Sequence, residues 1–127
     1  RRKREIFDLY AEQLGELSGV AFLQEEENAF SNRWLTVCFI DEKENGIRVE
    51  ELLSYLEEEN IEARHVWKPL HLQPLFKDFP FFPHSEKEPV SEKVFSRGVC
   101  LPSGTNLTVD DQMRVIHCLK RKLEKQR

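Results

Sequence analysis

The residue types best suited to chemistry gather in one stretch, Arg64–Pro74, which reads Arg-His-Val-Trp-Lys-Pro-Leu-His-Leu-Gln-Pro. Its two prolines hold the residues before them in extended conformations, so the stretch is predicted to begin as a strand and continue as a stiff loop. Lys68, His71 and Gln73 bring a cation, an imidazole and an amide to this loop, next to the large ring of Trp67. Such a set suits an anionic, hydrogen-bonding ligand.

A structural interpretation of the same residues stands beside this one. Loops carry function, but most polar loop residues do not, so residue types alone favour the structural alternative. In that alternative Trp67 belongs to the core, Lys68 is a solvated charge, and His71 is a capping or packing residue.

Length and composition limit the classes of function that this chain can have. A chain of 127 residues, with 39% hydrophobic and 33% charged residues, suits one globular domain with a charged surface. The net charge of −4 gives no basic excess, and no nucleic-acid-binding motif, membrane-length apolar run or signal-peptide core is visible. The three cysteines are odd in number and match no metal framework, which predicts a reducing, cytoplasmic environment.

The sequence contains no complete catalytic motif. The four histidines do not share metal-ligand spacing, and no motif frames a Ser, a His and an Asp as a nucleophilic triad. The loop Ser103–Thr105 precedes a helix N-terminus, where anions can bind. It has only one glycine, and the two acids that follow it would repel an anion, so the pattern is not that of a phosphate-binding loop. Glu25, Glu26 and Glu27 are interpreted as a solvated turn instead of a metal site. No catalytic, cofactor-binding or metal-binding residue is therefore predicted within this chain.

Apolar periodicity predicts an α+β domain, in which a small antiparallel or mixed sheet of about three strands packs with about four helices. The predicted helices cover 3–18, 49–59, 90–97 and a final segment that Thr108 caps. The predicted strands cover 33–40, a segment that begins at 61 or 62, and 99–101, with a short extended piece at 19–23. Asn60 is expected in the left-handed conformation that ends a helix. No capping residue precedes the first helix, which indicates that it continues from upstream sequence.

Residues 75–88 are the least regular stretch of the chain. Four phenylalanines alternate there with prolines, which forbid a long helix. The phenylalanines need a surface to pack on, and two interpretations are held equally. The stretch is either a lid over the core of the same domain or an interface with another domain or subunit.

Three motifs in a fixed order resemble one protein family. They are Trp67-Lys68-Pro69-Leu70-His71-Leu72-Gln73-Pro74, then Arg97-Gly98-Val99-Cys100-Leu101-Pro102-Ser103-Gly104, then Leu107-Thr108-Val109-Asp110-Asp111-Gln112, and the segments 32–35 and 61–64 fit the same order. On these motifs the chain, residues 1–127, resembles the C-terminal small domain of pyridoxal-phosphate-dependent nucleotide-sugar aminotransferases of the DegT/DnrJ/StrS type. Residues 1–18 resemble the helix that links this domain to a large domain.

The resemblance implies a fold type I aminotransferase that moves the amino group of glutamate to a keto-sugar linked to UDP or dTDP. The lysine that binds pyridoxal phosphate would lie upstream of this chain, and Lys68 does not take its role. The isolated chain is therefore expected to bind no cofactor and to be inactive. The full-length enzyme is expected to be a homodimer in which the small domain contacts its own large domain and the second subunit.

The same resemblance assigns expected roles to the residues of the stiff loop. His71 and Lys68 are expected near the sugar or its diphosphate, with Trp67 and Gln73 as supporting residues and Arg64 as a more distant candidate. The phenylalanine-rich stretch would then lie near the large domain or the second subunit. Two alternatives stay open: a free-standing α+β module that binds a small molecule through this loop, and a protein-interaction module that docks through the phenylalanine-rich stretch.

Overall fold

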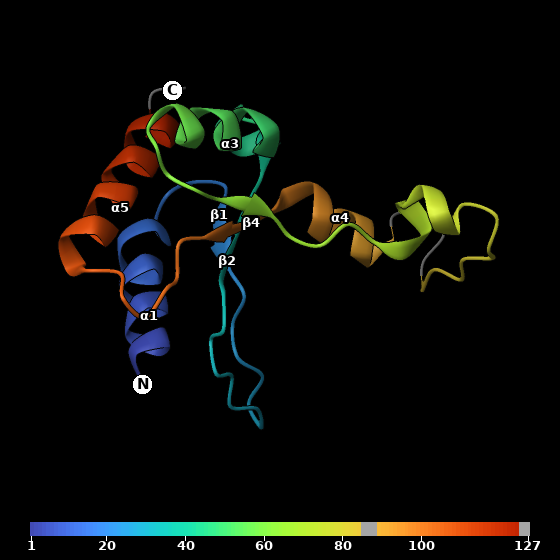
Figure 1. The fold of residues 1–127 in the computed structure, drawn as a ribbon, viewed down its shortest axis with the longest axis horizontal. Coiled ribbons are helices and arrows are strands. Elements are labelled where there is room, and N and C mark those ends of the chain that lie inside the picture. The colour runs from blue at the N-terminus through green and yellow to red at the C-terminus, as the bar shows by residue number, and fades with distance from the viewer. Residues whose placement is uncertain (85–88, 125–127) are drawn as a thin grey trace.

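A four-stranded antiparallel sheet forms the centre of the computed structural model, which describes residues 1–84 and 89–124 (Figure 1). The spatial order of the strands is β1-β2-β4-β3. Their bounds are β1 (Val20–Phe22), β2 (Thr36–Ile40), β3 (Arg64–His65) and β4 (Gly98–Leu101). The predicted α+β class is confirmed, with one strand more than expected. The additional strand is β1, which pairs antiparallel with β2 and places Val20 opposite Ile40.

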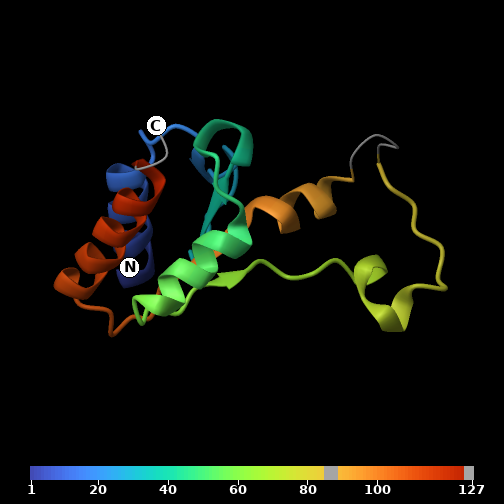
Figure 2. The same cartoon turned by 90° about the horizontal axis from the view of Figure 1, so that it is seen from above.

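Three helices pack together on one face of the sheet, and α1 and α5 lie side by side in both views (Figures 1 and 2). The α-helices are α1 (Arg2–Leu14), α2 (Glu42–Asn45), α3 (Val49–Glu58), α4 (Val90–Arg97) and α5 (Val109–Glu124). Apolar side chains of α1, α3 and α5 form one buried core with alternate residues of β2 and β4. The short α2 was not predicted; Asp41 caps it and Gly46 ends it in the left-handed conformation. Within the described ranges, no helix combines the length and the apolar character that a bilayer span requires.

Several predicted element ends are confirmed, and two are wrong. Asn60 has a φ of 56° after α3, and the Thr108 hydroxyl accepts a hydrogen bond from the backbone N–H of Asp111 at 3.1 Å before α5. The first helix ends at Leu14 instead of residue 18. The strand predicted from residue 33 begins at Thr36, because Arg33 has a φ of 49° and a left-handed residue interrupts a ladder.

Residues 66–84 and 89–97 form an arm that extends away from the sheet and from α1, α3 and α5 (Figure 2). The side chains of Leu75, Phe79 and Phe82 on this arm are 78%, 66% and 85% exposed. The lid interpretation is therefore wrong for residues 75–84, because these side chains do not pack on the core. Residues 85–88 of that stretch lie outside the described residues. The interface interpretation stays a prediction.

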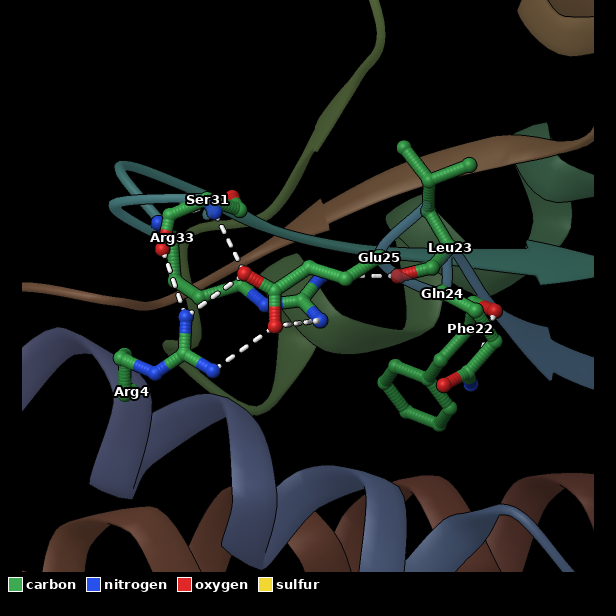
Figure 3. A network of polar contacts seen from close by, with 7 residues as sticks. All are labelled: Arg4, Phe22, Leu23, Gln24, Glu25, Ser31 and Arg33. Atoms are coloured by element: carbon green, nitrogen blue, oxygen red, sulfur yellow. Dashed lines mark hydrogen bonds and ion pairs between the residues drawn. The ribbon is translucent and has the colours of Figure 1, made fainter. Parts of the chain in front are cut away.

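A network of charges around Glu25 holds the loop between β1 and β2 (Figure 3). The Arg4 guanidinium of α1 donates to both carboxylate oxygens of Glu25, at 2.8 and 2.7 Å, and the backbone N–H of Ser31 donates to Oε1. Arg33 forms an ion pair with Glu25 at 3.7 Å and donates to the Leu23 carbonyl at 2.8 Å. The interpretation of Glu25 as part of a solvated turn is wrong, because two guanidinium groups enclose its carboxylate.

We expect Leu56→Ala to lower the free energy of unfolding by about 2–5 kcal/mol, because it leaves a cavity in a packed core. The Leu56 side chain is fully buried between α3 and the rest of the core. Urea unfolding followed by circular dichroism measures the change. Leu75→Ala removes the same group from an exposed position, and a loss as large as that of Leu56→Ala would contradict the assigned core.

We expect the stabilising effect of Glu25 to depend on pH. The hydrogen bonds from Arg4, and then that from Ser31, lower the pKa of Glu25 from 4.5 to about 2. A lowered folded-state pKa means that the stabilisation is present above about pH 4.5 and is lost as the pH falls toward 2. Glu25→Gln should therefore lower the urea midpoint at pH 7, and the difference from the wild type should shrink in acid. Glu27→Gln, at an exposed position, is the matched control; an identical pH profile for both variants would refute the network.

Candidate functional site

A cavity of about 720 Å³ opens beside the edge strand β3, between the end of β4 and the first turns of α5. Two of the predicted site residues, Arg64 and Trp67, line it. Other contributors are Trp34 from the loop before β2, Ser103 and Asn106 from the loop after β4, and Arg114 from α5. The cavity thus collects residues from four separate parts of the chain.

Trp67 stacks on Trp34 at the wall of this cavity. The two ring centroids lie 5.8 Å apart, with 29° between the ring planes. The side chains are 66% and 62% exposed, so the expectation that Trp67 belongs to the core is wrong. The reason is local: β3 has only two residues, and the chain leaves the sheet before Trp67 can reach the core.

Charged groups around the cavity are paired with groups of the same chain. Arg64 is paired with the Glu62 carboxylate, and the Arg114 guanidinium donates to the Glu59 carbonyl. Burial raises the pKa of Cys100, so the cavity is lined by a thiol instead of a reactive thiolate. The arrangement suits binding through stacking and hydrogen bonds, and it offers no activated nucleophile.

His71 lies farther along the arm, outside the cavity lining, and contacts other residues of the arm. Its imidazole stacks on the Phe81 ring with centroids 3.5 Å apart, and Nε2 lies 2.9 Å from the Glu92 carboxylate. The side chain is 15% exposed. His71 therefore connects the 3₁₀ turn on which it lies, Leu70–Leu72, to α4.

Lys68 and Gln73 form the base of the loop that carries His71. The Gln73 amide donates to the Lys68 carbonyl at 2.9 Å, which closes the loop, and the Lys68 side chain is exposed. The structure thus divides the five predicted site residues into two groups. Arg64 and Trp67 share the cavity, whereas Lys68, His71 and Gln73 share the arm.

The cavity does not fit a site that holds pyridoxal phosphate through a lysine. Its lining contains no lysine. The Ser103 hydroxyl is not free for a phosphate, because it accepts from the Thr36 N–H at 3.0 Å and donates to the Leu101 carbonyl at 2.7 Å. Ser103 is therefore a structural residue, contrary to the phosphate-binding possibility. Nor does any group of three His, Cys, Asp or Glu within 1–84 and 89–124 have an arrangement that could hold a metal ion.

Trp34 is one of the cavity residues that the sequence did not identify as candidates. Its contact with Trp67 joins positions more than thirty residues apart, which periodicity does not predict. The available signal was the count of tryptophans: the sequence has two, one within the predicted strand 33–40 and one in the stretch 64–74.

Residues 1–120 match the DegT/DnrJ/EryC1/StrS aminotransferase family. EpsN of Bacillus subtilis (strain 168), named as a candidate pyridoxal phosphate-dependent aminotransferase, is 48% identical over 118 residues, which cover 93% of this chain and 30% of that protein. GDP-perosamine synthase of Vibrio cholerae is 29% identical over 94% of this chain and 31% of its own length. The chain thus spans about a third of the length of these relatives.

Solved structures agree with this result. DesI, whose crystal structure was analysed in the presence of its TDP-sugar product, superposes with a TM-score of 0.81 and 28% sequence identity. The similarity covers 94% of this chain and 30% of the DesI chain. The fold is therefore that of part of a fold type I aminotransferase. Since the family match takes in nearly all of the sequence, the chain belongs to the DegT/DnrJ/EryC1/StrS aminotransferase family.

Proposed function

We propose that this chain is the C-terminal small domain of a pyridoxal-phosphate-dependent enzyme that moves an amino group from glutamate to a keto-sugar. The observation that carries the proposal is the 48% identity to EpsN, which extends over 93% of this chain. The cavity supports a binding role, because its residues stack and form hydrogen bonds but include no activated nucleophile.

A sugar linked to a nucleoside diphosphate is the proposed amino acceptor. GDP-perosamine synthase and DesI, with its TDP-sugar product, support this class of substrate. UDP and dTDP are the nucleotides that the motif resemblance implies, and the first of these relatives adds GDP. An exposed cation such as Lys68 and an aromatic residue such as Trp67 suit a ligand with a diphosphate and a planar base.

The cofactor would be held elsewhere in the full-length enzyme. Pyridoxal phosphate, when bound, supplies the electron sink for amino transfer. The lining of the cavity lacks a lysine, which supports a cofactor lysine outside these 127 residues. The role proposed for this domain is to help close the site over the sugar nucleotide, and the isolated chain is expected to be inactive.

The proposed partners are the enzyme's own large domain and a second subunit, in a cytoplasmic homodimer. The apolar side chains of Leu75, Phe79 and Phe82 support this, because exposed clusters of this kind mark protein interfaces. Three free cysteines fit a reducing compartment. Sedimentation of the longer protein tests the dimer, and a monomer mass would contradict it.

Within that enzyme, His71 and Lys68 would lie near the sugar or its diphosphate. The exposed Lys68 ammonium suits the diphosphate. Glu92 and Phe81 already contact the His71 ring. His71 would therefore meet the substrate with the part of its side chain that stays exposed at the surface of the arm. Three residues would support the substrate: Trp67 through stacking, Gln73 by closing the loop, and Arg64 through its charge.

We expect the gene, expressed together with its neighbouring coding region, to give a protein whose absorbance shows bound pyridoxal phosphate. Glutamate should shift the spectrum to the pyridoxamine form, and a nucleotide-linked keto-sugar should restore it. The 127-residue chain alone should show neither change. A longer protein without a cofactor band, or with a band that glutamate leaves unchanged, would refute the proposed function.

We expect His71→Ala in the longer enzyme to lower kcat/KM for the sugar nucleotide by roughly tenfold and to affect the glutamate half-reaction little. The size is that of one lost hydrogen bond to a charged group. Glu92→Gln is the control, because it weakens the partner of His71 and leaves the imidazole in place. Equal losses in both half-reactions, or the same loss in Glu92→Gln, would show that His71 acts only through the shape of the arm.

A further inference from the structure

Trp34 and Trp67 are the two tryptophans of the sequence, and they contact each other at the surface. Tryptophan is usually well buried, yet more than 60% of each side chain here is exposed. Stacking at 5.8 Å leaves no room for a third ring between them, so a planar ligand would have to lie on an outer face of the pair.

The loop that carries Trp34 is fixed on several sides. The backbone N–H of Trp34 donates to the Asn32 side chain at 3.0 Å, and its carbonyl accepts from the Lys3 ammonium at 3.0 Å. The neighbouring Arg33 is 9% exposed, and its guanidinium lies 3.6 Å from the centre of the Phe7 ring. Together with the Glu25 network of Figure 3, these contacts hold Trp34 in place before any ligand arrives.

The same anchors connect Trp34 to the opposite wall of the cavity. The Lys3 ammonium also donates to the Ser103 carbonyl, at 2.5 Å, so one side chain ties the loop before β2 to the loop after β4. Asn106 and Asp111 line the cavity near that second loop and are exposed. An amide and a carboxylate can donate to and accept from the polar edge of a heterocycle.

We propose that Trp34 and Trp67 form an aromatic platform on which the base of the sugar nucleotide stacks, with Trp34 as a contact residue in addition to Trp67. This inference rests on the proposed function, which supplies the class of ligand. A planar base matches an open indole face, and stacking of this kind tolerates different bases. A bare sugar or a diphosphate alone would leave most of the platform unused.

Binding of UDP, dTDP and GDP to the 127-residue chain tests the platform, with equilibrium dialysis as the measurement. We expect saturable binding of at least one of them, and a Kd raised about tenfold in Trp34→Ala and in Trp67→Ala. Ribose 5-phosphate, which has no base, should not compete. The near-ultraviolet circular dichroism of the stacked pair should change when the nucleotide binds.

Leu23→Ala is the matched control, because it removes an exposed apolar side chain from the same loop but outside the cavity lining. Its Kd should equal that of the wild type. The platform would be refuted if none of the three nucleotides bound saturably, or if the Kd were unchanged in Trp34→Ala. The exposed tryptophan pair would then be assigned to a contact with another protein surface. Far-ultraviolet circular dichroism excludes variants that fail to fold.

The inference and the proposed function fail in different ways. Nucleotide binding that depends on Trp34, in a longer protein that transfers no amino group, would refute the function and leave the platform standing. Amino transfer with the same KM for the sugar nucleotide in the wild type and Trp34→Ala would refute the platform and leave the function standing.

Discussion

The antiparallel pairing of β2 with β4 is the constraint on which the rest of the structure depends. The register runs from Thr36 opposite Leu101 to Phe39 opposite Gly98. One face of this pair enters the core under α1, α3 and α5. The loops that line the cavity leave one end of this pair, and the arm leaves the other end. An ion pair between Asp41 and Arg97, at 3.0 Å, fastens the end that carries the arm. A shift of one residue in this register would reverse the faces and displace both regions.

Local rules predicted much of the fold, because its helices are amphipathic and their ends carry ordinary caps. Asn60 and Thr108 do in the structure what their types predict. The failures are tertiary. Glu25 sits among three glutamates that look alike in sequence, and the approach of Arg4, Arg33 and the Ser31 backbone N–H makes its carboxylate different. No local pattern could choose one of the three.

The candidate site shows the same division between local and tertiary information. Eleven adjacent residues, 64–74, looked like one site, but the chain leaves the sheet in their midst and carries them apart. Arg64 and Trp67 stay at the cavity, and His71 is bound into the arm by Phe81 and Glu92. Closeness in sequence therefore merged two environments into one predicted site. Trp34, which completes the first of them, was invisible because its partner lies on another loop.

The distribution of apolar surface bears on the proposed role of this chain as part of a larger enzyme. The buried core under α1, α3 and α5 forms one cluster that does not include the tryptophan pair or the aromatics of the arm. Apart from Phe30, which lies under the Arg4 guanidinium, the exposed aromatics gather in two places, the tryptophan pair and the arm. Keeping such side chains in water forgoes stabilisation that burial would provide. A ligand or another protein surface can recover that free energy, which is what the proposed nucleotide platform and the proposed interface of the arm require.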